Sequence, residues 1–364
     1  MGSAVNSKNQ ALRWPIAFHN VAECAAMTDG GLRFQRVPEA VRCQLNEHAR
    51  ERMLDAVGSE VRFVMHDEQA TVRLHTTGTQ TQVVIFFGDI PTDQPAQIGP
   101  ELTELRIRKP RWLLEIDPAR LAPVAFDPRV CRVVLYRGTV CFHGVDGAIE
   151  PPSAGQLPPL GYLAYGTSIT QGASAARRHL SYVPQTAWRL GADAINLGSA
   201  SSAFCEPAMA DHIAERCDWH VATLALSTNM SGFNLDVFRE RVDYMVRRVA
   251  GADPKRAVAC ITLWPKAADL GPDHCGRGHA AAPEAYREVL REVVHGCGMP
   301  NVHLLEGPDL LPHWRGLGPD LLHPHEYGHS LIAANLAPRL EHLLALHNLP
   351  RPIPPMPADP KMAP

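Results

Sequence analysis

Several features that would assign this chain to a large functional class are missing from its sequence. It has no lysine-rich run, no basic face with interleaved aromatics and no acidic tail, and its formal net charge is only −3. This balance argues against nucleic acid or a charged membrane surface as the main partner. The sequence shows no apolar run long enough to span a bilayer and no secretory signal pattern. A small-molecule substrate is therefore the simplest expectation.

The sequence also lacks a paired CxxC motif. Its 9 cysteines are scattered, and several lie inside apolar runs, as Cys260 does in AVACITL, where a buried free thiol is the ordinary interpretation. This distribution favours a reducing compartment, so we expect a cytoplasmic protein. The sequence has neither a P-loop lysine nor a complete GxGxxG, which disfavours nucleotide binding at its Gly-rich turn.

The first 150 residues are predicted to form mostly β-strands. The segment VRFVMH places Val61, Phe63 and Met65 on one face, and TVRLHTTGTQTQVVIFF alternates on both sides of a Gly-containing turn, which is typical of a hairpin. The segments LTELRIR, RWLLEID and CRVVLYRGTVCFHGV continue this alternation. We therefore predict an N-terminal β-sandwich, or jelly-roll-like, module over residues 1–150.

A change of pattern after this module predicts a second domain. The proline-rich segment EPPSAGQLPPLG marks a linker at 151–160. The short apolar runs GYLAY, DAINL, WHVATLAL, AVACITL and NVHLL then alternate with helical stretches, which predicts βα units and a parallel sheet over 161–347. The proline-rich tail, 348–364, is predicted to be disordered.

The stretch GYLAYGTSITQGASA places a lone hydroxyl at a predicted strand-to-helix turn. Because Gly166 permits backbone angles that other residues resist, Ser168 can stand at the tip of a tight turn, where a nucleophile belongs. The alternative interpretation is that Gly166, Thr167 and Ser168 only cap the next helix. The residues that follow the other strands decide between the two.

Those residues contain the parts that acyl transfer requires, at the carboxyl ends of strands where open parallel sheets bind ligands. A serine needs a base, and the base needs an acidic partner that fixes its tautomer. Asp320 and His323 are three residues apart, so both can project from one turn onto the same side. The amides of Ser168 and Gly198 and the carboxamide of Asn229 are suitable donors to an oxyanion.

The chain thus presents a serine, a glycine, an asparagine and a D-x-x-H pair, in this order. In this respect its second half resembles the SGNH (GDSL-type) serine hydrolase superfamily. YGTSITQG resembles its serine block, NLGSAS its glycine block, STNM its asparagine block and DLLHPHEYGH its histidine block. The resemblance covers roughly residues 160–345 and implies a flavodoxin-like three-layer α/β/α fold. It implies the nucleophile Ser168, the general base and later acid His323, its orienter Asp320, and the oxyanion donors Ser168, Gly198 and Asn229. With its N-terminal β module, the chain is similar to a branch that includes carbohydrate acetylesterases.

The chain departs from the family's blocks at a few positions. Thr167 stands where many members have aspartate, and Ser227 and Met230 stand where the asparagine block commonly has glycine and aspartate. Thr167 keeps a hydroxyl able to bond to the loop, and with Trp264 it is our candidate for substrate binding. Trp264 could instead pack in the core, which is the favoured interpretation for a lone aromatic at a strand end.

Two other groups of residues suggest metal or thiol chemistry and are set aside. His313, His325 and His329 crowd the base, but HPHEYGH lacks the H-E-x-x-H pattern, so we expect no metal. The glycine-containing segment DHCGRGH, 273–279, is predicted to be a lid or pocket wall. Cys205 is disfavoured as a nucleophile because no separate histidine and amide are suggested for it.

The sequence therefore predicts a serine esterase that needs no cofactor. The expected substrate is a small-molecule or oligosaccharide ester with a short acyl group, acetyl foremost, because the sequence shows no long apolar lid helix of the kind that long-chain lipases use. An acyltransferase on the same scaffold and a non-catalytic carbohydrate-binding protein stay open as alternatives. The β module could complete the wall of the site, bind glycan or form a homo-oligomer interface.

Overall fold

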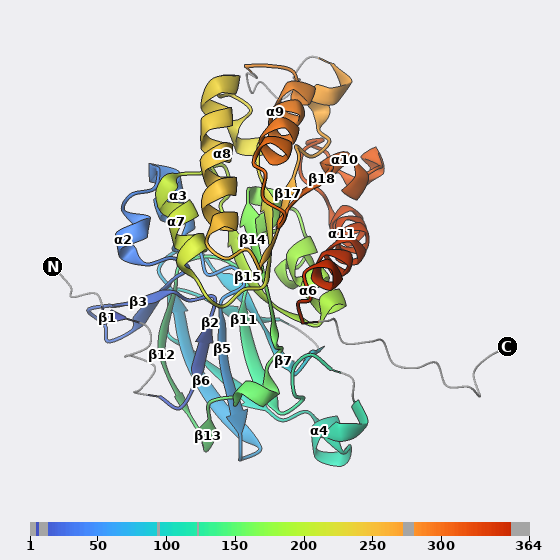
Figure 1. Ribbon diagram of the computed structural model, residues 1–364. Helices are drawn as coiled ribbons and strands as arrows, with labels where there is room; N and C mark the ends of the chain where they lie inside the picture. The colour runs from blue at the N-terminus through green and yellow to red at the C-terminus, as the bar shows by residue number, and fades with distance from the viewer. Residues whose placement is uncertain (1–4, 7–13, 93–94, 122–123, 272–279, 351–364) are drawn as a thin grey trace.

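The computed structural model describes residues 5–6, 14–92, 95–121, 124–271 and 280–350. Figure 1 shows two parts: antiparallel β-sheets formed by the N-terminal residues, blue to teal, and a parallel sheet flanked by helices, green to red. Among the described residues, no helix has the length and apolar character needed to cross a bilayer.

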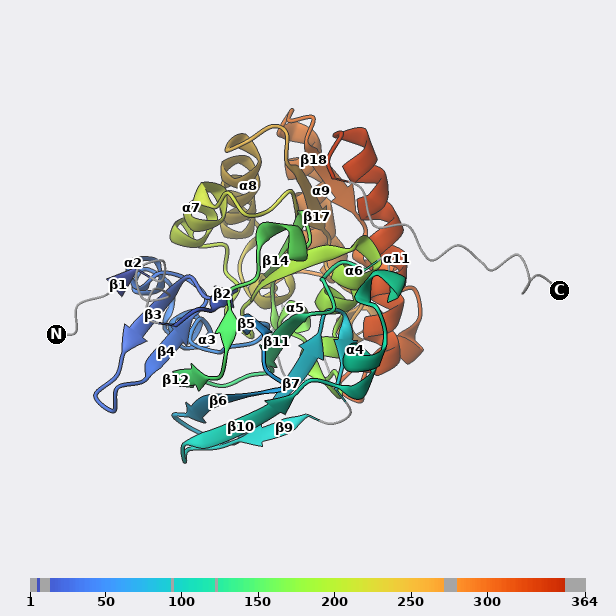
Figure 2. The ribbon, with the colours of Figure 1, turned by 90° about the horizontal axis from the view of Figure 1, so that it is seen from below.

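The N-terminal part, here called the sandwich, consists of two antiparallel sheets, as predicted. The first sheet contains, in spatial order, β1 (Val5–Asn6), β3 (Glu23–Ala26), β4 (Leu32–Gln35), β12 (Val140–Asp146), β6 (Gln69–Thr76) and β10 (Thr103–Arg108). The second contains β13 (Ile149–Glu150), β5 (Glu60–Met65), β11 (Val130–Leu135), β7 (Thr81–Phe87) and β8 (Ile90–Pro91), with β2 (Ala17–His19) beside β5 and β9 (Ala96–Ile98) beside β7. In Figure 2 the second sheet lies between the first sheet and the C-terminal part.

One hydrophobic core joins the two sheets. Val61, Phe63 and Met65 of β5 all belong to it, together with Val72 and Leu74 of β6. The predicted facing of VRFVMH is therefore confirmed, because alternate residues of a strand point to the same side.

The hairpin predicted for TVRLHTTGTQTQVVIFF is wrong. Strand β6 pairs with β10 and β12 in the first sheet, whereas β7 pairs with β11, β8 and β9 in the second. The Gly-containing turn thus carries the chain from one sheet to the other. Alternation shows which side chains face the core, and it does not show which strand is the neighbour. RWLLEID was also predicted wrongly as a strand, since residues 111–115 form the helix α4 (Arg111–Glu115).

The C-terminal part is a five-stranded parallel sheet with helices on both faces. Its spatial order is β15 (Ala192–Gly198), β14 (Leu160–Gly166), β16 (Val221–Ala225), β17 (Ala257–Ile261) and β18 (Val302–Leu305). This 2-1-3-4-5 order is that of flavodoxin-like folds, so the predicted fold is confirmed. One core holds α7 (Pro207–Glu215), α8 (Leu235–Gly251) and α9 (Pro283–Gly296) against the sheet, and a second core holds α6 (Tyr182–Leu190) and α11 (Glu326–Leu346).

Short helical segments complete the described chain. They are α2 (Glu39–Arg42), α3 (Glu47–Arg52), η2 (Pro118–Leu121), η3 (Ala154–Gln156), α5 (Ser168–Gln171), η4 (Arg178–Leu180), η5 (Thr228–Met230), η6 (Ala267–Leu270), α10 (Gly307–Leu310) and η7 (Trp314–Gly316). The predicted linker, 151–160, contains η3 and the first residue of β14. The predicted disordered tail lies outside the described residues from position 351 onward.

The sandwich covers the open edge of the parallel sheet. Strand β15 is one of the two edge strands of this sheet, and edge strands present unpaired backbone groups. The Nη1 group of Arg36 donates to the carbonyl oxygens of Asn196 and Gly198 at 3.0 and 2.9 Å. Arg62 binds both carboxylate oxygens of Asp193 at 2.6 and 2.7 Å. These bonds tie the sandwich to the strand that precedes one loop of the predicted site.

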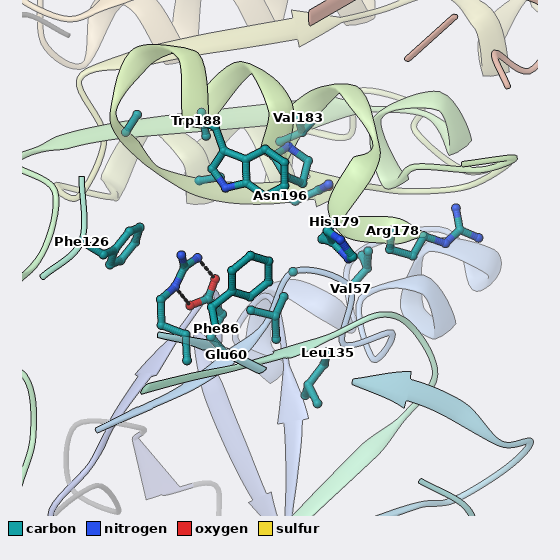
Figure 3. A pocket seen from close by; sticks show the side chains of 17 residues that line it. Val57, Glu60, Phe86, Phe126, Leu135, Arg178, His179, Val183, Trp188 and Asn196 are labelled. Atoms are coloured by element: carbon teal, nitrogen blue, oxygen red, sulfur yellow. Dashed lines mark hydrogen bonds and ion pairs between the residues drawn. The ribbon is translucent and has the colours of Figure 1, made fainter. Parts of the chain in front are cut away.

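A cavity of about 50 Å³ remains between the sandwich and α6. Figure 3 shows Phe86 and the ion-paired Glu60 on the sandwich side, facing Trp188 and Val183 of α6. The cavity is mostly apolar and Ser168 is not among its lining residues. It is a gap in the packing between the two parts, too small for a sugar ester.

Candidate active site

Ser168 is the first residue of α5 and follows β14 at the predicted strand-to-helix turn. The side chain of Thr167 caps the helix by accepting a hydrogen bond from the backbone N–H of Ile169 at 3.3 Å. A Cβ atom at Gly166 would lie 2.3 Å from Oγ1 of Thr170, so only glycine permits this close approach. The local sequence therefore positions the Ser168 hydroxyl on a rigid turn.

The structure brings Ser168, His323 and Asp320 together. Ser168 Oγ lies 2.8 Å from His323 Nε2, although 155 positions separate the two residues in the sequence. His323 Nδ1 lies 2.6 Å from Asp320 Oδ2. With a proton on Nδ1, His323 donates to the carboxylate and its Nε2 can accept the proton of the serine hydroxyl.

The carboxylate of Asp320 is held in its charged form. Partial burial alone would raise its pKa, but hydrogen bonds from the His323 side chain and from the backbone N–H groups of His323 and Leu322 keep the pKa below its ordinary value. Leu321, between the two site residues, has a left-handed backbone conformation with φ 46°. This uncommon conformation helps to turn the chain so that Asp320 and His323 face each other.

The role of Gly198 in the structure differs from the predicted one. Its amide N–H donates to Oδ1 of Asn196 at 2.8 Å, so in this structure the amide is not available to an oxyanion. A Cβ atom at Gly198 would lie 2.3 Å from the backbone nitrogen of Gln171. The glycine is therefore required because α5, which carries Ser168, packs directly on it. The prediction of Gly198 as an oxyanion donor is corrected on this ground.

Asn229 lies in η5, after β16, as the predicted crevice requires. Its Oδ1 accepts a hydrogen bond from the backbone N–H of Ala203 at 3.1 Å. This bond fixes the orientation of the carboxamide and leaves the NH2 group for another acceptor.

Neither predicted substrate-binding residue is accessible. Trp264 is 1% exposed and packs against Tyr182, with ring centroids 6.0 Å apart. Thr167 is also 1% exposed, and its hydroxyl serves as the helix cap. Both substrate-binding predictions are wrong, because the packing and capping interpretations apply instead.

The serine opens into a cleft of about 350 Å³ between the two parts of the chain. The C-terminal part lines it with Ser168, Gln171, Ala173, Arg178 and Ala200, and the sandwich lines it with Arg52, Asp55, Thr79, Thr81, Arg137 and Gly138. The sandwich residues were missed in the sequence, because a strand pattern does not tell which of its loops faces a distant serine. Of the roles left open for this module, the structure thus shows the completion of the cleft wall.

Gln171 links the two walls of this cleft. Its Nε2 group donates to Asp55 Oδ2 at 2.9 Å, and its Oε1 accepts from the backbone N–H of Ala200 at 2.8 Å. Asp55 Oδ1 in turn accepts from the backbone N–H of Gly138 at 3.1 Å. The helix that carries Ser168 is therefore bound to the sandwich by a side chain in its own last turn.

The histidines around the base have structural contacts. His325 Nε2 lies 2.7 Å from the carbonyl oxygen of Arg315, and His329 Nε2 lies 2.9 Å from that of Ala173. Within the described part of the chain, the one group of side chains that could hold a metal ion is Asp29, His75 and His143, in the sandwich and outside this cleft. The predicted lid segment DHCGRGH, residues 273–279, lies outside the described residues.

Comparisons with known proteins agree with this architecture. Residues 164–331 match the model of the GDSL-like Lipase/Acylhydrolase family. The chain is similar to the structure of a salicylyl-acyltransferase from a tetracycline biosynthetic pathway, at 17% identity and a TM-score of 0.71, over 95% of this chain and 98% of that one. A putative GDSL-like lipase from Bacteroides ovatus matches at 15% identity and a TM-score of 0.66, over 94% and 98%. A family two carbohydrate esterase from Cellvibrio japonicus matches at 12% identity and a TM-score of 0.60, over 95% and 98%.

No curated protein sequence matches the chain. At these identities the solved structures show the fold, and they show it over nearly the whole of each chain, sandwich included. The family model therefore identifies residues 164–331 as a GDSL-like lipase/acylhydrolase domain, and the chain as a whole has the fold of these solved structures.

Proposed function

We propose that this enzyme hydrolyses short-chain acyl esters, acetyl esters foremost, of a carbohydrate or another polyol. The observation that carries the proposal is the continuous hydrogen-bonded series from Ser168 through His323 to Asp320. A serine, an imidazole and a carboxylate in this order are the parts of a nucleophilic acyl-transfer site.

The reaction proceeds in two balanced steps. Ser168 Oγ attacks the ester carbonyl carbon while its proton passes to His323 Nε2, and the alcohol then leaves with that proton. Water attacks the acyl-serine next, giving its proton to His323, which returns it to Ser168 as the acid is released. Asp320 holds the imidazole in the required tautomer and stabilises its charged form.

Two donors are proposed for the negatively charged oxygen of the tetrahedral intermediate. The backbone N–H of Ser168 is at the first position of α5, where helix amides have no partner within the helix. The NH2 group of Asn229 is the second, since the opposite side of its carboxamide is held by Ala203. Gly198 supports the site by admitting α5.

A polar alcohol fits the cleft, whose walls carry arginine, aspartate, glutamine and threonine side chains. Among the structurally similar proteins are the family two carbohydrate esterase from Cellvibrio japonicus and an acetyl xylan esterase from Butyrivibrio proteoclasticus. Their names support an acylated sugar as the substrate class.

An acyltransferase is the second candidate, because the salicylyl-acyltransferase matches with a TM-score of 0.71. In that reaction an acceptor alcohol replaces water in the second step. Analysis of products with and without acceptor alcohols separates the two: free acid alone indicates hydrolysis, and a new ester indicates transfer.

The test of the proposal is turnover of activated acetyl, butyryl and longer esters, with acetylated sugars alongside. Ser168→Ala is expected to lower kcat/KM by at least about 10³-fold. Ser199→Ala is the matched control, since this buried loop serine bonds to Ser202 and does not line the cleft. Undiminished turnover by the Ser168→Ala variant would contradict the proposal.

A further inference from the structure

Three arginines line the cleft that contains Ser168. Arg52 ends α3 and Arg137 follows β11, both in the sandwich, while Arg178 begins η4 in the C-terminal part. Within the residues that the structure describes, none of the three is within ion-pair distance of a carboxylate, whereas Arg62 and Arg132 elsewhere in the chain are both paired. Three guanidinium groups therefore line one cleft, and none of them is ion-paired with a described carboxylate.

Arg178 is the least satisfied of them. Its Nη1 atom is buried and has no hydrogen-bond partner, and the same is true of Oγ1 of Thr81 in the same cleft. Burial lowers the pKa of the Arg178 guanidinium, Asp55 opposes this effect, and Arg137 reinforces it. Buried polar atoms without partners are rare in native proteins, and a ligand that supplies the missing acceptor is one explanation.

Among the described residues that line the cleft, Asp55 is the one carboxylate, and both of its oxygens already accept hydrogen bonds. Asp55 Oδ1 accepts backbone N–H groups of Val57 and Gly138 at 3.2 and 3.1 Å, and its Oδ2 accepts from Gln171 at 2.9 Å. Asp55 organises the two walls, and with three arginines against one aspartate the described lining of the cleft carries an excess of positive charge. Guanidinium groups with free N–H donors are matched in geometry and charge by carboxylate and phosphate oxygens.

We propose that the natural ester substrate carries an anionic group, a carboxylate or a phosphate, which binds Arg178 while Ser168 attacks the ester. Arg52 and Arg137 increase the attraction from the sandwich side. This inference rests on the esterase function proposed for Ser168. It assigns the sandwich a part in substrate selection, because two of the three arginines belong to it.

The test uses acetyl esters that differ in charge: 4-acetoxybenzoate, its neutral amide 4-acetoxybenzamide, and 4-acetoxyphenyl phosphate. We expect kcat/KM for at least one anion to exceed that for the amide by about 10-fold or more, and to fall with added salt. The better of the two anions identifies the charged group. Arg178→Gln is expected to reduce the anion-to-amide ratio of kcat/KM by about 10- to 100-fold. Arg137→Glu is expected to reduce it by several-fold.

Arg106→Gln is the matched control, because Arg106 is exposed on β10 and does not line the cleft, and the ratio is expected to stay unchanged. Equal kcat/KM values for the three esters, with equal salt dependence, would overturn the inference while leaving the esterase function intact. If no ester is hydrolysed, the esterase function fails and binding decides the inference. Calorimetry on the Ser168→Ala variant should then show tighter binding of the anions than of the amide, lost on adding Arg178→Gln; equal or undetectable binding would overturn it.

Discussion

His329 makes a hydrogen bond that only the neutral form of its ring can make. We therefore expect protonation of this ring to destabilise the protein in acid. The side chain is fully buried. Its Nε2 lies 2.9 Å from the carbonyl oxygen of Ala173, and its Nδ1 accepts the backbone N–H of Tyr182 at 3.3 Å. One ring nitrogen must donate and the other accept, so a second proton would break the bond to Tyr182.

The direction of the pH effect follows from the pKa of this ring. Burial lowers the pKa of His329 from its ordinary value of 6.5 to about 4, with the Ala173 carbonyl opposing part of the effect. Between these two values the unfolded chain binds more protons than the folded one, so the free energy of unfolding decreases as the pH falls through this window. For this residue alone, the loss of stability from pH 7 to pH 5 is about 2 kcal/mol.

Urea unfolding at these two pH values, for the wild type and for His329→Gln, tests the magnitude. Glutamine keeps an N–H donor for Ala173 and cannot become charged, although it leaves the Tyr182 N–H without its acceptor, which costs about 1–3 kcal/mol at neutral pH. The loss of stability on acidification should be about 2 kcal/mol smaller in the variant than in the wild type. His342→Gln, an exposed position on the same helix, is the control and should keep the wild-type loss. An equal loss in His329→Gln and wild type would refute the reasoning.

Substitutions at three further positions test the site. Asp320→Asn should lower kcat by about 10³- to 10⁴-fold with little change in Tm, because the imidazole loses its orienting carboxylate; a smaller effect than 10-fold would argue against that role. Gly198→Ala should lower the free energy of unfolding by about 1–3 kcal/mol and also lower kcat, because the new methyl group displaces α5, and retention of both values would contradict the packing argument. Gln171→Ala should lower kcat/KM, because it removes the hydrogen bonds that hold α5 to Asp55 and Ala200. Gln171→Glu, which repels Asp55, should lower kcat/KM further.

The residues of the hydrogen-bonded series could be predicted from the sequence for a simple geometric reason. Carboxyl ends of parallel strands gather at one edge of the sheet, so residues that follow separate strands must meet there. Ser168 and the pair Asp320 and His323 obey this rule. The state of the Gly198 amide could not be predicted, because it depends on the rotamer of Asn196, which turns back to accept it.

The burial of the charged residues on β5 could not be predicted from the sequence. Alternation in β5 places Arg62 and Glu60 on the face opposite the sandwich core, which a sequence pattern assigns to solvent. The structure buries Arg62 to 2% and Glu60 to 5% exposure, because this face packs on the C-terminal part. Polar residues on one strand face are compatible both with exposure to solvent and with burial in a charged interface. The periodicity of the sequence therefore cannot distinguish these two environments.

That interface also explains how a separate β-sandwich can shape a catalytic cleft. Burial alone would raise the pKa of the Glu60 carboxyl, but Arg132 and Arg62 hold it well below its usual range. Arg62 continues the network to Asp193 on β15. Removing the Asp193 carboxylate would leave Arg62 without this partner while the interface keeps it buried, and breaking a buried pair in this way costs about 3–5 kcal/mol. The sandwich is thus bound to the strand that leads into the site, and its residues Arg52 and Arg137 line the same cleft as Ser168.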